Sequence, residues 1–364
     1  MKQPLHEIRK NPLLWLLIFV TVVFVAEAIK PEPHVPLFFL SILAIVPLAV
    51  LLSQATESVA AKAGDTVGGL LNATLGNLTE LVIALAALRA GEFMLVKATV
   101  AGTTVTNTLF MLGASFLLGG LKHRTQEYNP AMARLQSIQL FLASIVLLIP
   151  SAISEVDSAS AKAFTQKLSI CLSVLLIATY AMGLFFSLKT HREFFGSASH
   201  EQDELSPWPL AVALPTLGGV TVLVALVSEV FVESVQKAAL TLGMSTAFVG
   251  FVVVALVGAA AEMTAAFSGA RKNRLDLSVG IALGSATQIA LFVAPVLMLA
   301  SYVIAPNPMD LRFWPGSVVM MLIATISAAL VANNGRSAWF HGVLLLMVYF
   351  IFAVTLYLLP PAGQ

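Results

Sequence analysis

The chain has 364 residues, of which 58% are hydrophobic and 11% are charged, and its formal net charge is +1. The charged share is less than half of the roughly 25% that soluble domains carry. Together with a mean hydropathy of +0.91, it predicts an integral membrane protein whose main partner is the lipid bilayer. A charge so close to zero gives no indication of a nucleic-acid partner.

Apolar stretches of about 20 residues have the length of helices that cross a bilayer. Eleven such stretches follow one another along the chain, so we expect an all-α integral membrane protein with eleven transmembrane helices. The first has a basic start but no convincing cleavage site after it, which favours an uncleaved span over a signal peptide. The expected spans are residues 12–29, 36–57, 69–89, 93–120, 134–153, 168–189, 208–234, 245–270, 275–304, 313–332 and 337–359.

The distribution of cations predicts the orientation of these spans. With a cytoplasmic N-terminus, 13 of the 20 Lys and Arg residues fall on cytoplasmic segments, as the positive-inside bias requires. We expect the inner, or plasma, membrane of a bacterium, and a vacuolar membrane stays open as the alternative. The oligomeric state also stays open.

An internal repeat appears when the sequence is shifted against itself without a gap, so that Gly76 falls on Gly258 and Glu80 on Glu262. Each copy holds five spans, an odd number, so the second copy must enter the membrane upside down. Inverted repeats commonly place their binding site near the midplane, where the halves meet. The expected layout is an N-terminal helix in residues 1–34, a first repeat in 35–189, an acidic cytoplasmic linker in 190–207 and a second repeat in 208–364.

The two repeated acids, Glu80 and Glu262, each lie about a dozen residues into an apolar span. A charged residue at that depth costs about 2.5–3.5 kcal/mol on insertion scales, so an acid there is usually functional. Small and polar residues, such as Asn77, surround the acids. Gly76 and Gly258 fit a broken helix that exposes carbonyl oxygens to a cation. Close helix packing explains the two glycines equally well and stays open.

A second polar element lies in the fourth and ninth spans. Thr103 and Asn107 follow Gly102, and Ser285 and Gln288 follow Gly284 at the corresponding place. Hydroxyls can be satisfied by carbonyls of their own helix, whereas the amides of Asn107 and Gln288 need partners from outside it.

Two carboxylates with neutral oxygens fit a hard divalent cation, because calcium takes six to eight oxygen ligands. The sequence contains no cluster of His or Cys residues of the kind that would indicate a zinc or copper site. Two ionised glutamates in a dry site would repel each other, so the site must hold either a divalent ion or protons before it changes sides. Exchange of calcium for protons follows, with no cofactor. Sodium in place of protons stays open on electrostatic grounds.

Three further acids lie near the ends of predicted spans: Glu57 at the end of 36–57, and Glu229 and Glu233 at the end of 208–234. In the expected orientation Glu57 faces the cytoplasm and Glu233 faces the opposite side. This placement fits one acid at each mouth of the ion pathway. Ordinary snorkelling to the interface is the alternative.

The segments GGLLNATLGNLTELVIALAALRAGE and GAAAEMTAAFSGARKNRLDLSVGIALGSATQIALFVAP resemble the two signature repeats of the calcium/proton exchangers, a branch of the calcium:cation antiporter superfamily. The resemblance implies that Glu80 and Glu262 bind the ion and carry the protons. Carbonyls near Gly76 and Gly258, and the polar groups of the second element, would lie nearby. It also implies that the second and seventh spans slide to switch access. This sequence departs from the family pattern in Ala259 and Met263, where the family has Asn and His.

We therefore predict a secondary active antiporter that exports calcium from the cytoplasm in exchange for protons by alternating access. A sodium-coupled exchanger of the same fold is the alternative. An intramembrane enzyme is not expected, because no Ser-His pair, HExxH or paired-aspartate motif lies at membrane depth. A passive channel is a further alternative, which saturating flux coupled to protons would exclude.

Overall fold

A computed structural model of the chain describes residues 12–29, 34–153, 159–191 and 207–359, which are almost entirely helical. The elements of the first half are η1 Pro12–Leu17, α2 Ile18–Ile29, α3 His34–Lys62, α4 Asp65–Leu75, α5 Leu78–Arg89, α6 Phe93–Val105, η2 Thr106–Met111, α7 Leu112–His123, β1 Thr125–Glu127, α8 Pro130–Ile153, α9 Ala159–Phe185 and η3 Phe186–Thr190. Those of the second half are α11 Leu210–Thr241, α12 Thr246–Phe248, η5 Val249–Val254, α13 Ala255–Gly258, α14 Ala260–Arg271, α15 Leu275–Gln288, η6 Ile289–Val293, α16 Ala294–Ile304, α17 Pro315–Ala332, β2 Arg336–Ala338 and α18 Trp339–Leu358.

Within the described residues, nine helices are long and apolar enough to cross a membrane, and two bent helix pairs raise the number to as many as eleven. Each predicted apolar stretch overlaps one of these elements. The predicted acidic linker falls almost wholly in 192–206, outside the described residues.

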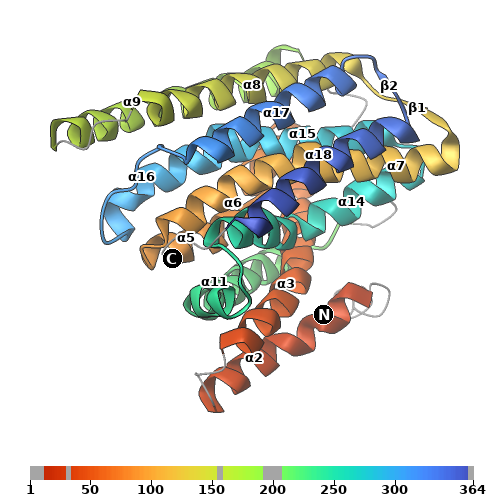
Figure 1. Ribbon diagram of the computed structural model, residues 1–364. Helices are drawn as coiled ribbons and strands as arrows, with labels where there is room; N and C mark the ends of the chain where they lie inside the picture. Colours follow the sequence, from red (N-terminus) through yellow and green to blue (C-terminus); the bar gives the residue numbers. More distant parts are fainter. Residues whose placement is uncertain (1–11, 30–33, 154–158, 192–206, 360–364) are drawn as a thin grey trace.

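The two longest helices, α3 and α11, pack along each other on the side of the molecule where α2 also lies (Figure 1). The rings of Phe38 and Phe231 stack across this contact, with centroids 5.5 Å apart. On the opposite side α8 packs against α17 and α9 against α16. Between these two sides lie α6, α7 and α15, whose buried faces form much of the core.

One prediction about α3 and α11 is wrong: Glu57 and Glu233 do not close their helices. α3 continues to Lys62 and α11 to Thr241. Both helices are followed within two residues by a glycine with positive φ, Gly64 at 82° and Gly243 at 69°. Glycine adopts this conformation without steric cost, and it commonly ends helices. Turns rich in alanine continue both helices past the acids.

The central helices of the two halves have the same irregularity. α6 passes into the π-helical segment η2 at Thr106, and α15 passes into the π-helical segment η6 at Ile289. Gly102 lies at the contact between α6 and η5, where the two backbones are so close that a Cβ on Gly102 would collide with the backbone of Phe251. π-Helical segments are rare and are frequent at functional sites. Their presence at matching places therefore draws attention to the residues around them.

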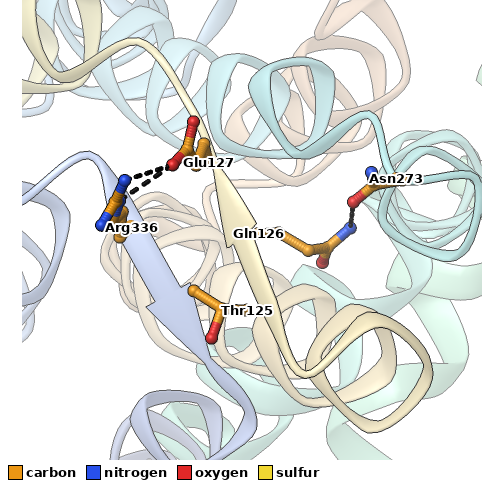
Figure 2. Close-up of a pocket in the computed structure, with 5 residues that line it drawn as sticks. All are labelled: Thr125, Gln126, Glu127, Asn273 and Arg336. Carbon is orange, nitrogen blue, oxygen red and sulfur yellow. Dashed lines mark hydrogen bonds and ion pairs between the residues drawn. The ribbon is translucent and has the colours of Figure 1, made fainter.

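The expectation of an all-α chain is wrong in one detail, because β1 and β2 form a two-stranded antiparallel sheet. β1 follows α7 in the first half and β2 precedes α18 in the second, so the sheet joins the halves at one end of the molecule (Figure 1). Figure 2 shows the ion pair of Glu127 with Arg336 (2.6 Å) and the hydrogen bond from Gln126 Nε2 to Asn273 Oδ1 (2.9 Å). Strands of three residues are too short to show a hydropathy pattern.

These residues and Thr125 line an open hollow of about 610 Å³. Its single acid, Glu127, is already paired with Arg336, and neither Glu80 nor Glu262 lines it. The hollow is therefore a junction between the halves rather than the candidate site, despite its size.

Candidate ion-binding site

The first predicted acid follows a break in a helix. α4 ends at Leu75 and α5 begins at Leu78, and the two half-helices are bent by 41°. Between them the backbone of Asn77 leaves helical geometry, with φ −102° and ψ 34°. Glu80 consequently lies in the first turn of α5. Free backbone amides and the helix dipole favour negative charge at that end of a helix.

The second acid stands in the same arrangement. α13 ends at Gly258 and α14 begins at Ala260, with a bend of 59° between the two parts of this span. Glu262 lies in the first turn of α14. The shift that places Gly76 on Gly258 also places Glu80 on Glu262. The repeat noted in the sequence therefore coincides with two matching breaks, each followed by an acid.

The two acids line one small pocket. Glu80 is buried, with 3% of its surface exposed, and Glu262 is half-buried. A Cβ on Gly258 would lie 2.9 Å from Glu80 Cγ and 3.4 Å from its Oε1, so the glycine leaves room for the carboxylate of the other half. The cavity volume is about 10 Å³, roughly the room that one water needs. The other lining residues are Ala49, Leu52, Ser53, Leu75, Gly76, Leu78, Thr79 and Ala261.

Because Glu80 and Glu262 line the same pocket, their carboxylates repel each other electrostatically when both are ionised. In a buried site this repulsion is much stronger than in water, because the effective dielectric constant is low. The pair therefore needs positive charge, as a cation or as protons.

A chain of hydrogen bonds connects the two halves beside the acids. Asn107 Nδ2 donates to Ser285 Oγ at 2.8 Å, and Ser285 Oγ donates to Asn77 Oδ1 at 2.7 Å. The residues come from η2, α15 and the break before α5. Gln288 lies next to the same break, since a Cβ on Gly76 would be 3.4 Å from Gln288 Oε1. The structure thus brings these four polar residues, predicted from two separate motifs, together around one break.

Several predicted site residues have a buried polar atom without a hydrogen-bond partner among the described residues. A buried polar group without a partner costs about 1–3 kcal/mol, and such groups call for an explanation, such as an ion. The oxygens among them are ligands that a hard cation prefers. These atoms are Glu80 Oε1, Glu262 Oε2, Thr103 Oγ1, Asn107 Oδ1, Asn77 Nδ2 and Gln288 Nε2.

The predicted mouth acids differ in their relation to the pocket. Glu57 is exposed on α3, and it accepts a hydrogen bond of 2.9 Å from Ser53 Oγ, a residue that lines the pocket. Glu233 is exposed on α11 and does not line the pocket. Ser53 was not among the residues predicted from the sequence. Its place four residues before Glu57, on the same helix face, was an available signal.

The profile of the sodium/calcium exchanger protein family matches residues 34–189 and 212–358. A Ca2+/H+ antiporter of Aphanothece halophytica is 35% identical, over 97% of this chain and 98% of its own length. The Ca2+/H+ antiporter ChaA of Bacillus subtilis is 39% identical, over 90% of this chain and 93% of its own. The chain belongs to the calcium/proton exchanger family.

The solved structure of the Ca2+/H+ antiporter protein YfkE is similar to 96% of this chain, with a TM-score of 0.82 and 34% identity, and the match covers all of YfkE. The family resemblance indicated by the two signature segments is therefore confirmed.

The two departures of this chain from the family signature lie at the second break. Ala259 occupies the position in the second repeat that Asn77 has in the first, and it is fully buried. Met263 is also buried, directly after Glu262. Because Ala259 has no amide side chain, the second break lacks a counterpart of the hydrogen bond that Asn77 accepts from Ser285 at the first. The two halves of the site are therefore chemically unequal.

Proposed function

We propose that the chain is a secondary active antiporter that exports calcium from the cytoplasm in exchange for protons, by alternating access at a site with two membrane-buried glutamates. The observation that carries this proposal is the meeting of Glu80 and Glu262 at one pocket, each from the first turn of a half-helix. The printed names of the bacterial relatives, both Ca2+/H+ antiporters, support the choice of ions.

The oxygens around the acids suit calcium. Two carboxylates supply the charge, and Thr103 Oγ1 and Asn107 Oδ1 are buried oxygens without a partner among the described residues. Backbone carbonyls at the breaks near Gly76 and Gly258 add to these. Calcium accepts such a mixed and irregular set, because it takes six to eight oxygens and tolerates varied geometry. No group of three or more His, Cys, Asp or Glu side chains lies together in the described residues, so the ligand set we propose relies on neutral oxygens.

Coupling to protons follows from the same pair of acids. With calcium bound, both glutamates are ionised and the divalent charge balances them. Without calcium, two buried like charges would cost several kcal/mol, so the glutamates take up protons before the site changes sides. The protons then leave on the side where calcium enters. In this account the acids that bind calcium also carry the protons, and no separate proton path is needed.

We further propose a layout of eleven spans, with an N-terminal helix in 1–34 and two inverted repeats in 35–189 and 208–364. The family profile matches two segments, 34–189 and 212–358, that nearly coincide with these repeats. The matching helix breaks support the same layout. The N-terminus and the linker 190–207 would be cytoplasmic, in the inner membrane of a bacterium.

In that orientation Glu57 lies at the cytoplasmic mouth and Glu233 at the opposite one. The hydrogen bond of Glu57 with Ser53 links the cytoplasmic mouth to the pocket. The long contact between α3 and α11 suits two helices that slide against each other to switch access.

Transport in proteoliposomes tests this proposal. The purified protein is reconstituted, and a pH gradient is imposed with no sodium on either side. We expect calcium to move against its own gradient, with a saturable rate and an opposite movement of protons. Calcium movement that requires sodium would contradict proton coupling in favour of a sodium-coupled exchanger. Flux without saturation or proton movement would contradict antiport altogether.

A further inference from the structure

At the first helix break, the carbonyl oxygen of Ala73 has an unusual hydrogen-bond partner. In an unbroken helix this oxygen would accept the amide of Asn77, four residues later. The backbone at Asn77 has left helical geometry, and the phenolic hydroxyl of Tyr180 donates to Ala73 O instead, at 2.5 Å. Tyr180 lies on α9, outside the broken span. Its hydroxyl therefore takes the place of a helical amide at the break.

The ring of Tyr180 is held by an aromatic contact that has a counterpart in the other half. Tyr180 stacks on Phe292 of η6, with ring centroids 5.5 Å apart. Tyr349 on α18 packs on Phe110 of η2 at a similar distance, 5.1 Å. The shift that relates the two acids also places Phe110 on Phe292. In each case the last helix of one half meets the π-helical segment of the other.

The two tyrosine hydroxyls nevertheless have different partners. Tyr349 Oη accepts a hydrogen bond of 3.4 Å from Thr106 Oγ1. At the second break, Ala255 O, which corresponds to Ala73 O, accepts the amide of Ala259 at 3.1 Å. That carbonyl keeps a helical partner, so the second break does not use a tyrosine. Of the two breaks in the described part of the chain, only the first has a side chain from another helix in place of the backbone amide that would bond this carbonyl.

We propose that Tyr180 is a positioning residue for the ion site. Tyr180 does not line the pocket, but it fixes the end of α4, directly before the residues that form the site. With the hydroxyl present, Ala73 O is satisfied and the amide of Asn77 need not return to the helix. Asn77 then stays where it accepts Ser285 Oγ, and Glu80 stays in the first turn of α5. This inference depends on the proposed function, because the effect is read as calcium affinity.

Without the hydroxyl, Ala73 O would lack its partner, at a cost of about 1–3 kcal/mol. The backbone can recover this energy by restoring the helical bond from Asn77, which straightens the break and draws Asn77 and Glu80 away from the site. Calcium binding then has to reopen the break. About 1.4 kcal/mol of this cost corresponds to a tenfold loss of affinity.

The test compares Tyr180→Phe with Tyr349→Phe in proteoliposomes under an imposed pH gradient. Both changes remove one hydroxyl and keep a packed ring, so Tyr349→Phe is a matched control. We expect Tyr180→Phe to raise the KM for calcium about tenfold with kcat within about twofold, and Tyr349→Phe to leave KM within about twofold. A wild-type KM in Tyr180→Phe, or an equal rise in both variants, would overturn the inference. If the wild-type protein itself exchanges no calcium for protons, the proposed function fails instead.

Incorporation of 3-fluorotyrosine at position 180 keeps the test decisive if Tyr180→Phe does not fold. The fluorinated ring keeps the hydroxyl and makes it a stronger donor. We expect a KM for calcium at or below that of the wild type. A KM for calcium raised about tenfold, as expected for Tyr180→Phe, would overturn the inference, because the hydrogen bond from the hydroxyl to Ala73 O would then not position the site.

Discussion

Ser285 connects the two halves of the site, and its removal should weaken both calcium binding and folding. The hydroxyl donates to Asn77 Oδ1 at 2.7 Å and accepts from Asn107 Nδ2 at 2.8 Å. Ser285→Ala leaves both amide groups buried without these partners, at about 1 kcal/mol or more for each lost bond. We therefore expect the free energy of unfolding to fall by about 2 kcal/mol. The KM for calcium should rise about tenfold if about 1.4 kcal/mol of the cost falls on the ion-binding geometry.

The assay measures initial rates of calcium uptake into proteoliposomes against calcium concentration at a fixed pH gradient, together with thermal unfolding in detergent. Ser301→Ala is a matched control. Ser301 is 1% exposed and Ser285 is 5% exposed, and Ser301 also makes two hydrogen bonds, to Met298 O and from Met309 N. Unlike Ser285, Ser301 makes neither of its two hydrogen bonds to a predicted site residue. The control should lose similar stability with an unchanged KM. A wild-type KM in Ser285→Ala, or an equal rise in the control, would refute the reasoning.

Two further substitutions separate the site from its scaffold. Gly258→Ala places a methyl group 2.9 Å from Glu80 Cγ, so we expect calcium uptake to fall at least about tenfold. The control variant Gly218→Ala, whose methyl group meets nothing within 4 Å, should transport calcium normally. Normal uptake in Gly258→Ala would show that the two halves do not meet there. Lys97 and Asp310 form an ion pair of 2.5 Å, and their side chains are only 15% and 22% exposed, respectively. Asp310→Asn removes the negative charge of this pair, so we expect the free energy of unfolding to fall by about 3 kcal/mol and the KM for calcium to stay unchanged. Unaltered thermal unfolding would contradict the importance of this ion pair.

Hydropathy and the internal repeat predicted the positions of the spans and the two acids, because both depend on local composition. Residues 275–304, for example, coincide with the observed run from Leu275 to Ile304. The repeated Gly76 and Gly258 marked the places where the helices break. α3 and α11 continue past the predicted ends at 57 and 234, because hydropathy marks the apolar stretch of a helix, and the helix itself can extend beyond that stretch.

The remaining features depend on contacts between residues far apart in the chain. Ser285 and Asn77 are 208 residues apart, and Tyr180 and Ala73 are 107 apart. A single sequence has no local signal for such pairs: a tyrosine in an apolar helix looks the same whether it faces lipid or caps a carbonyl. The β1–β2 sheet was missed for the same reason, since it joins residues 125–127 to 336–338.

The most direct test of the two-glutamate site is calcium-driven proton flux in proteoliposomes made with Glu80→Gln and with Glu262→Gln. The amide keeps the size of the side chain but carries neither charge nor proton. Glu229→Gln is the control, because that carboxylate is 48% exposed and paired with Arg89 at the surface, where an ion pair contributes little. The account predicts no exchange in either site variant, although both insert and fold, and near-normal exchange in the control. Near-normal proton flux in Glu80→Gln or Glu262→Gln would contradict it.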